Sequence, residues 1–155
     1  MKKHPVPDRR TYGVEADRAL DLWVALARCA SSVSRVSSRD IQRHGLTQAQ
    51  FAVLDVLYHK GPMALCTIGA KLLVTGGNVT FVVNQLDKSG WIKRRRSPDD
   101  GRVIVARLSA KGQALMDRCF PVHAAAMADA ASALAPREQA RLARLLKKWG
   151  KSVAG

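Results

Sequence analysis

The sequence predicts a mostly α-helical protein with one small β-hairpin, arranged as a winged helix-turn-helix between longer helices at the two ends of the chain. Three observations predict this fold class. Residues 64–90 contain two short stretches with the apolar spacing of helices, and Gly76-Gly77 lies between them. Residues 91–108 contain two strand-like stretches around a turn-forming tip at 97–102. Long amphipathic stretches precede and follow this part of the chain.

The N-terminal end is predicted to begin with a flexible basic arm over residues 1–13. One long amphipathic helix is then expected over residues 14–44, and Gly45 ends it. The apolar stripe of this helix consists of Leu22, Trp23, Leu26, Ala27, Ala30, Val33, Val36 and Ile41. Such a helix would span ~45 Å, which exceeds the body of a domain of this size. We therefore expect a second copy of the chain to cover part of the stripe.

The winged part of the chain is expected to occupy residues 47–108. Its first helix begins at Thr47, because Thr47 and Gln50 have the spacing of a capping box. Gly61 and the proline after it end that helix. Residues 63–65 then have the composition of a short edge strand, which we expect to lie beside the hairpin.

The second helix of the predicted helix-turn-helix has one apolar and one polar face. The residues expected to face the core are Val79, Val82, Val83 and Leu86. The residues expected to face outward are Asn78, Thr80, Phe81, Asn84, Gln85 and Lys88. Asn78 has the position of a helix cap, and Gly90 has the position of the C-terminal stop.

Two further helices are predicted after the hairpin. The first covers residues 110–131, follows Ser109, and is rich in alanine, which permits the close approach of another helix. The second begins at Pro136, a favoured residue for a first helical turn, and continues to about residue 150. Its apolar stripe consists of Leu142, Leu145, Leu146 and Trp149.

The charge of the chain limits its possible partners. The formal net charge is +14 and the isoelectric point is about 10.6, which favours a polyanion, either nucleic acid or an anionic membrane. Residues 86–111 hold eight Lys or Arg and three Asp. No apolar run has the length of a transmembrane helix or the position of a signal peptide. We therefore expect a cytoplasmic protein that binds nucleic acid and no membrane.

Catalytic, metal-binding and cofactor-binding patterns are missing from the sequence. Cys29, Cys66 and Cys119 are odd in number and widely spaced, which argues against disulfides and a zinc site and favours small buried hydrophobes. The 12 acidic residues include no pair at a recognisable catalytic spacing. Neither a G-x-S-x-G motif nor a phosphate-binding glycine loop occurs. We therefore expect no metal, no cofactor and no enzymatic activity.

Three motifs in order carry a resemblance to a known family: residues 73–80 (LVTGGNVT), 100–102 (DGR) and 108–112 (LSAKG). They resemble the recognition helix, the wing and the Leu-Thr-x-x-Gly exit of the MarR (multiple antibiotic resistance regulator) family. The resemblance covers roughly residues 17–149. Ser109 replaces the usual threonine of the exit and keeps its helix-capping hydroxyl.

The resemblance implies a fold and a function together. It implies a single MarR-type domain over residues 14–150, in which residues 14–44 and 110–150 form the dimerisation helices. It also implies a bacterial homodimeric transcriptional regulator, a repressor on a palindromic double-stranded DNA operator whose symmetry mirrors that of the protein.

With this family match, residue chemistry predicts the contacts to the major groove. Asparagine can bond adenine edges, while threonine and phenylalanine can pack on thymine methyl groups. The expected readers are Thr75, Asn78, Thr80, Phe81 and Asn84. Gly76 and Gly77 would let the backbone approach a phosphate closely. For Asn78, a simple helix cap stays open as the alternative role.

The wing is predicted to supply phosphate contacts and one minor-groove contact. Arg94, Arg95 and Arg96 are consecutive cations on one strand, suited to phosphates. Arg102 at the tip would enter the minor groove, oriented by a bidentate pair with Asp100. A turn salt bridge without a DNA role is the alternative for Arg102.

The resemblance also implies a small aromatic effector, because MarR relatives often bind phenols or aromatic acids between the dimer helices and the winged part. A phenolic, benzoate-like or hydroxypyridine carboxylate ligand is expected. The residues expected at this site are Arg18, Leu22, Trp23, His44 and Phe51. Trp23 filling the dimer core and His44 finishing its helix stay open as alternatives.

Two other functions compete with this interpretation. The net charge of +14 would also suit a sequence-independent architectural DNA-binding protein, although the lightly charged recognition helix favours sequence reading. A thiol-redox-controlled repressor is a further branch of the family. Its sensing cysteine lies near the position of Trp23, whereas Cys29 lies about two turns further along.

Overall fold

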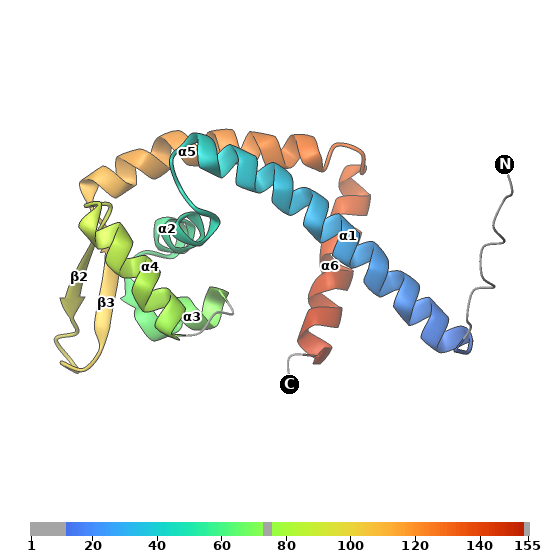
Figure 1. The fold of residues 1–155 in the computed structure, drawn as a ribbon, viewed down its shortest axis with the longest axis horizontal. Helices are drawn as coiled ribbons and strands as arrows, with labels where there is room; N and C mark the ends of the chain where they lie inside the picture. Colours follow the sequence, from blue (N-terminus) through green and yellow to red (C-terminus); the bar gives the residue numbers. More distant parts are fainter. Residues whose placement is uncertain (1–11, 73–75, 154–155) are drawn as a thin grey trace, which may run out of the picture. The chain divides into compact units, whose positions relative to one another are not determined.

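The structure is a computed structural model that describes residues 12–72 and 76–153. Among these residues the elements are, in order, α1 (Val14–Arg43), α2 (Gln48–Lys60), β1 (Met63–Ala64), α3 (Leu65–Leu72), α4 (Gly76–Lys88), β2 (Ile92–Arg96), β3 (Ile104–Leu108), α5 (Ala110–Ala130) and α6 (Pro136–Val153) (Figure 1). The chain is mostly helical with one small antiparallel sheet, so the predicted fold class is confirmed. It divides into two compact units, Met1–Arg35 and Val36–Gly155.

The first unit contains the N-terminal part of α1, which begins at residue 14 as predicted. Asp17 lies in its first turn, where a carboxylate suits the positive end of the helix dipole. Asp17 also accepts a hydrogen bond of 3.0 Å from the backbone amide of Tyr12. The apolar stripe is exposed in the single chain, since Leu22 is 54% and Trp23 58% exposed. Residues 1–11 of the predicted basic arm lie outside the described part of the chain.

In the second unit, a capped turn separates the end of α1 from α2. α1 ends at Arg43, and Gly45 adopts a φ of 73° that few other residues tolerate. The backbone amide of Gln50 donates to Thr47 Oγ1 at 3.2 Å, and the backbone amide of Thr47 donates to Gln50 Oε1 at 3.0 Å. The predicted capping box is therefore confirmed.

The sheet has the strand order β1-β3-β2, and both pairings are antiparallel. β1 pairs Met63 with Ala106 of β3, which confirms the predicted edge strand beside the hairpin. The strand has two residues rather than three, because α3 already begins at Leu65. β2 and β3 form the wing, and their register pairs Ile92 with Leu108.

α3 and α4 form the helix-turn-helix and meet at 114°, within the range of ~90–120° typical of this motif. α4 begins at Gly76, so Asn78 lies within its first turn and not at the helix-cap position that the sequence left open as its alternative role. Gly76 and Gly77 do not have positive φ angles and join the first turn. The Thr80 hydroxyl donates to the Gly76 carbonyl at 3.0 Å, as expected within one helical turn. The inward residues of α4 are buried as predicted: Val79, Val82, Val83 and Leu86.

The hydrophobic core of the second unit lies where α2, α3, α4, the sheet and α5 meet. Each of these elements supplies a side chain that is at most 1% exposed. Examples are Leu54, Ile68, Leu86, Ile92 and Met116. Four helices and the wing are therefore positioned by one common core.

The start of α5 is fastened to the base of the wing. The Ser109 hydroxyl caps α5 as predicted, accepting from the Gly112 amide at 3.0 Å and donating to the Gly90 carbonyl at 2.6 Å. Gly112 lies so close to Trp91 that a Cβ there would be 1.9 Å from the Trp91 carbonyl oxygen. Only glycine allows this approach of two backbones.

α6 begins at Pro136 as predicted and buries none of its residues in the single chain. Its stripe residues Leu142, Leu145 and Leu146 are 41%, 49% and 37% exposed. A helix with this pattern needs cover from another apolar surface. None of the described helices is both long and apolar enough to cross a membrane by itself.

Candidate DNA-binding site

The outer face of α4 carries the predicted base readers. Asn78, Thr80 and Phe81 are exposed, and Phe81 reaches 61% exposure although it is a large apolar side chain. Asn84, one helical turn further on, is half-buried. Thr75, another predicted reader, lies outside the described residues. An exposed aromatic ring between polar side chains suits contact with thymine methyl groups in a major groove.

The structure joins two predicted DNA contacts to each other. Arg94 of β2 donates from Nε to Asp87 Oδ2 at 2.9 Å and from Nη1 to Asn84 Oδ1. Asp87 and Asn84 both belong to α4. This cluster of Asn84, Asp87 and Arg94 fixes the wing strand against the recognition helix. Arg94 is thus held by the chain itself, unlike an arginine that is free to meet a phosphate.

The other two arginines of β2 are more open. Arg95 and Arg96 are both exposed, and Arg96 donates from Nη1 to the Gly101 carbonyl in the wing tip at 2.9 Å. This bond ties the tip to the strand without neutralising the positive charge. Both arginines keep a charge that suits a DNA phosphate.

Arg102 projects from the wing tip, with 93% of its side chain exposed. Asp100 Oδ1 accepts from the Arg102 backbone amide at 2.9 Å and from its Nε at 3.3 Å. The predicted bidentate pair is therefore wrong, because one carboxylate oxygen serves both the turn and the side chain. Asp100 still contacts Arg102 Nε, and the Arg102 side chain stays almost fully exposed.

A cleft of about 640 Å³ lies between α2 and α5. Phe51, one of the predicted ligand residues, lines it, and its ring centroid is 4.6 Å from that of His123. His123 Nδ1 lies 3.0 Å from the carboxylate of the buried Asp40. The remaining lining residues are Asp55, His59, Lys60, Phe120, Ala124 and Met127. The cleft thus combines aromatic rings with cationic or ionisable groups.

The other predicted ligand residues are placed differently. Arg18, Leu22 and Trp23 are exposed on the part of α1 in the first unit. His44 follows α1 and does not line the cleft between α2 and α5. Its Nε2 is buried without a hydrogen-bond partner among the described residues.

The cysteines differ in their surroundings. Cys119 is 1% exposed, and burial raises the pKa of its thiol, as a small hydrophobe in the core would show. Cys29 and Cys66 are exposed, so the prediction that all three are buried is wrong for these two. The described residues contain no group of His, Cys, Asp and Glu suited to a metal ion.

Comparisons with known proteins decide the family. The MarR family model matches residues 46–104, from the start of α2 through the wing. The chain is 43% identical over 136 residues to YkoM of Bacillus subtilis, an uncharacterised HTH-type transcriptional regulator, covering 88% of each protein. The chain belongs to the MarR family. This MarR-family chain is also 37% identical to the HTH-type transcriptional regulator MhqR of the same organism, over 86% of the chain and 92% of MhqR.

A solved structure has a similar fold. The fold matches Sco3205 of Streptomyces coelicolor, a MarR-family regulator solved in complex with DNA, with a TM-score of 0.83. That match is 21% identical and covers 96% of this chain and 94% of Sco3205. The predicted family and winged-helix fold are confirmed, and the chain is a DNA-binding transcriptional regulator of the MarR family.

Two side-chain pairs of this MarR-family chain were not predicted from the sequence, Asp87 with Arg94 and His123 with Asp40. Asp87 was not singled out, although an acid and an arginine on either side of Gly90 could have suggested a pair across that turn. The pair of His123 with Asp40 gave no local signal, since 83 residues separate the two side chains.

Proposed function

We propose that this regulator is a homodimeric repressor that reads a near-palindromic operator and is released from it by a small aromatic acid or phenol. The observation that carries the DNA-reading part is the pairing of a polar, exposed α4 face with a wing tip whose Arg102 is 93% exposed. A basic chain with these two features suits one contact in a major groove and one in the adjacent minor groove.

The proposed contacts divide into two kinds. Asn78, Thr80 and Phe81 would contact base edges, with Asn84 held in place by Arg94. Gly76, Gly77, Arg95 and Arg96 would approach phosphates, which supply affinity without sequence information.

A titration on two kinds of DNA tests this division. An operator is first selected from random duplexes, and each variant is titrated on it and on an unselected duplex. Arg102→Ala should lose ~1–3 kcal/mol on the operator only, because a groove contact depends on sequence. Arg95→Ala should weaken binding to both duplexes and lower the salt slope by about one unit. Equal operator affinity for Arg102→Ala and wild type would remove the wing tip from the mechanism, and failure to select any operator would favour an architectural DNA binder.

The dimer is supported by the two apolar stripes that the single chain leaves exposed. Leu22 and Trp23 on α1, and Leu142 and Leu145 on α6, are each more than 40% exposed. A second copy of the chain would remove these surfaces from water, and burial contributes roughly 25 cal/mol per Å². Two copies would also present two α4 helices to successive major grooves of a palindromic site.

The effector is supported by the cleft between α2 and α5. Its rings, Phe51 and Phe120, can contact an aromatic ligand, while Lys60 can pair with a carboxylate. We propose that Arg18, Leu22, Trp23 and His44 also take part in binding the effector. The ligand would bind more tightly to a dimer whose two winged parts are too far apart, or too close together, for successive major grooves. Its binding would therefore shift the population away from the DNA-bound state.

A ligand screen tests the effector. Salicylate, hydroxybenzoates and hydroxypyridine carboxylates are screened by thermal shift and then added to operator titrations. A true effector should stabilise the protein and weaken operator binding by ~1–3 kcal/mol, the usual size of such coupling. Lys60→Ala and Arg18→Ala identify which cation meets the carboxylate. If no compound of this class has either effect, the aromatic-effector proposal fails and redox control becomes the better hypothesis.

A further inference from the structure

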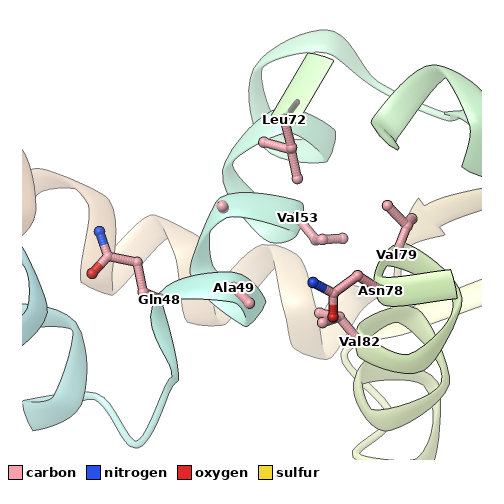
Figure 2. Close-up of a pocket in the computed structure, with 8 residues that line it drawn as sticks. Gln48, Ala49, Val53, Leu72, Asn78, Val79 and Val82 are labelled. Carbon is pink, nitrogen blue, oxygen red and sulfur yellow. The ribbon is translucent and has the colours of Figure 1, made fainter. Parts of the chain in front are cut away.

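A second cavity, of about 370 Å³ and partly open to solvent, lies in the winged part between α2, α3 and α4. Figure 2 shows Val53 of α2, Leu72 of α3, and Val79 and Val82 of α4 directed toward it. Its other lining residues are Gln48, Ala49, Ala52 and Asn78. The alanines and valines are short, so three helices that meet here leave space unfilled. The pocket is partly open to solvent, because Gln48, Ala49 and Asn78 are exposed, so a small molecule can enter it.

The lining selects a class of ligand. None of the described side chains around this cavity is charged, so a carboxylate would lose its hydration without gaining a cation. Six lining residues are aliphatic, and the carboxamide of Asn78 can donate and accept a hydrogen bond, whereas Gln48 Oε1 already accepts from the Ser38 hydroxyl. The volume lies near the lower end of the ~300–1,000 Å³ common for ligand pockets. A neutral molecule of one or two rings with a single hydroxyl, N–H or carbonyl fits these properties.

This cavity differs from the cleft between α2 and α5. That cleft contains Asp55, His59 and Lys60, which suit an ionic ligand, whereas the described residues that line the cavity beside α4 are apolar or carry an amide. α2 contributes to both, through Phe51 for the cleft and Val53 for the cavity. The two sites therefore select ligands of different charge.

The cavity also reaches the DNA-reading surface. Asn78 lines it and is exposed on α4, where it is a proposed base reader. One face of the same helix is joined to α2 by Gln50, whose Nε2 donates to Gln85 Oε1 at 3.3 Å. A ligand between α2 and α4 would occupy the Asn78 carboxamide and change how the start of α4 is held.

We propose that the cavity between α2, α3 and α4 is a second effector site for a neutral, mainly apolar ring compound, and that its occupation lowers operator affinity through Asn78. The binding part stands independently of the aromatic-acid effector. The effect on DNA rests on the proposed role of Asn78 in the operator contact.

Two matched substitutions separate the sites. Ala52→Leu fills part of the cavity beside α4, and Ala124→Leu fills part of the cleft beside α5. Indole, 2-naphthol and salicylate are titrated into wild type and both variants, with carbon-labelled methyl groups of Val, Leu and Ala observed by NMR. In wild type, a neutral compound should shift the methyl signals of Val53, Val79 and Val82. Ala52→Leu should weaken that binding at least tenfold, while Ala124→Leu should leave it within twofold.

The unliganded Ala52→Leu variant provides a second measurement. If the cavity exists in solution, the added side chain should fit and raise the unfolding temperature or leave it unchanged. A clear fall in unfolding temperature, or no shift of Val53, Val79 and Val82 with either neutral compound, would overturn the site. Since the methyl experiment uses the wild-type protein, poor folding of the variant would not prevent the test.

Operator titration with the neutral compound tests the consequence for DNA. Wild type should lose operator affinity by about three- to tenfold at saturating ligand, and Asn78→Ala should lose much less of its remaining affinity. Ligand binding without any change in operator affinity would overturn the regulatory part. A negative result for salicylate would affect only the aromatic-acid proposal, since salicylate serves the other cleft.

Discussion

Two amphipathic helices of this regulator, α4 and α6, differ in where their apolar faces lie. α4 buries Val79, Val82, Val83 and Leu86 against α2, α3 and β2 of its own chain. α6 is longer and has a continuous leucine stripe, yet none of its residues is buried in the single chain. The winged part therefore takes its stability from packing within the chain, whereas the apolar face of α6 stays exposed and is the surface that the proposed dimer would cover. The same kind of sequence pattern is used for folding in α4 and, under the proposed function, for assembly in α6.

A charge placed in the apolar stripe of α6 should give the largest effect, because it tests whether this stripe forms the dimer interface. Leu145→Asp should abolish the dimer at micromolar concentration, because a buried unpaired carboxylate at an interface costs several kcal/mol. Arg144→Asp is the matched control, since it adds a carboxylate one residue earlier and outside the stripe. Sedimentation should give twice 16.9 kDa for wild type and the control, and half that for Leu145→Asp. A dimeric Leu145→Asp variant would show that α6 does not form the interface.

A large-to-small substitution in each region sharpens the contrast. Leu54→Ala, at a side chain with 0% exposure, should lower the free energy of unfolding by ~2–5 kcal/mol whatever the protein concentration. Leu142→Ala should instead act mainly through the dimer, so its effect should depend on concentration. Chemical denaturation at two protein concentrations measures both. A concentration-independent loss for Leu142→Ala would mean that α6 packs within its own chain.

The close approach of Gly112 to Trp91 should give a smaller but definite effect. Gly112→Ala would place a methyl group 1.9 Å from the Trp91 carbonyl oxygen, so the start of α5 or the base of β2 must move. Overpacking of this kind costs ~1–3 kcal/mol, measurable by thermal unfolding. Gly150→Ala in α6, where nothing lies within 4 Å of the new Cβ, should be neutral or slightly stabilising.

The cluster of Asn84, Asp87 and Arg94 should influence DNA more than stability. The Asp87–Arg94 pair is about one-third exposed on both sides, so its loss should change unfolding by less than ~1 kcal/mol. Asp87→Ala should nevertheless loosen Asn84 and reduce operator discrimination. Comparing the ratio of operator to random-duplex affinity in Asp87→Ala and wild type tests this. An unchanged ratio would confine the cluster to a structural role.

The smallest expected effect concerns thiol reactivity. Burial raises the pKa of the Cys119 thiol, so near neutral pH this group stays protonated and unreactive. The exposed Cys29 and Cys66 should be alkylated first in the native protein, and Cys119 should react only after unfolding. Mass spectrometry of partly alkylated protein gives the order. Rapid native labelling of Cys119 would indicate that the core opens more often than its packing suggests.

Local chemistry made much of this fold predictable. The capping box of Thr47 and Gln50, the Ser109 cap and the start of α6 at Pro136 all depend on neighbours within four residues. The sequence places Gly76 and Gly77 in a turn, whereas in the structure both belong to the first turn of α4. Glycine permits both conformations, and the sequence alone does not choose between them.

The site was less predictable than the fold, because its contacts join distant residues. The Arg94 contact to Asn84 depends on how β2 packs on α4, and the cleft beside α5 depends on His123 meeting Phe51. Arg102 was predictable in place, since a turn-rich tip must expose it, but not in its pairing geometry. Contacts between residues that are close in sequence can be predicted from the residue types. Contacts between helices and strands that are distant in sequence depend on how the whole fold packs.

The joint between the wing and α5 has a practical consequence for building chimeric sensors. Ser109 bridges Gly90 and Gly112, and the Lys111 ammonium donates to the Ser89 carbonyl at 3.0 Å. A fusion boundary at the end of β3 would remove Ser109 and Lys111, whose hydrogen bonds hold the residues after α4. A DNA-binding module that is transferred to another protein should therefore retain the first turn of α5, at least through Gly112. The hydrogen bonds between α5 and the base of the wing would then be kept in the chimera.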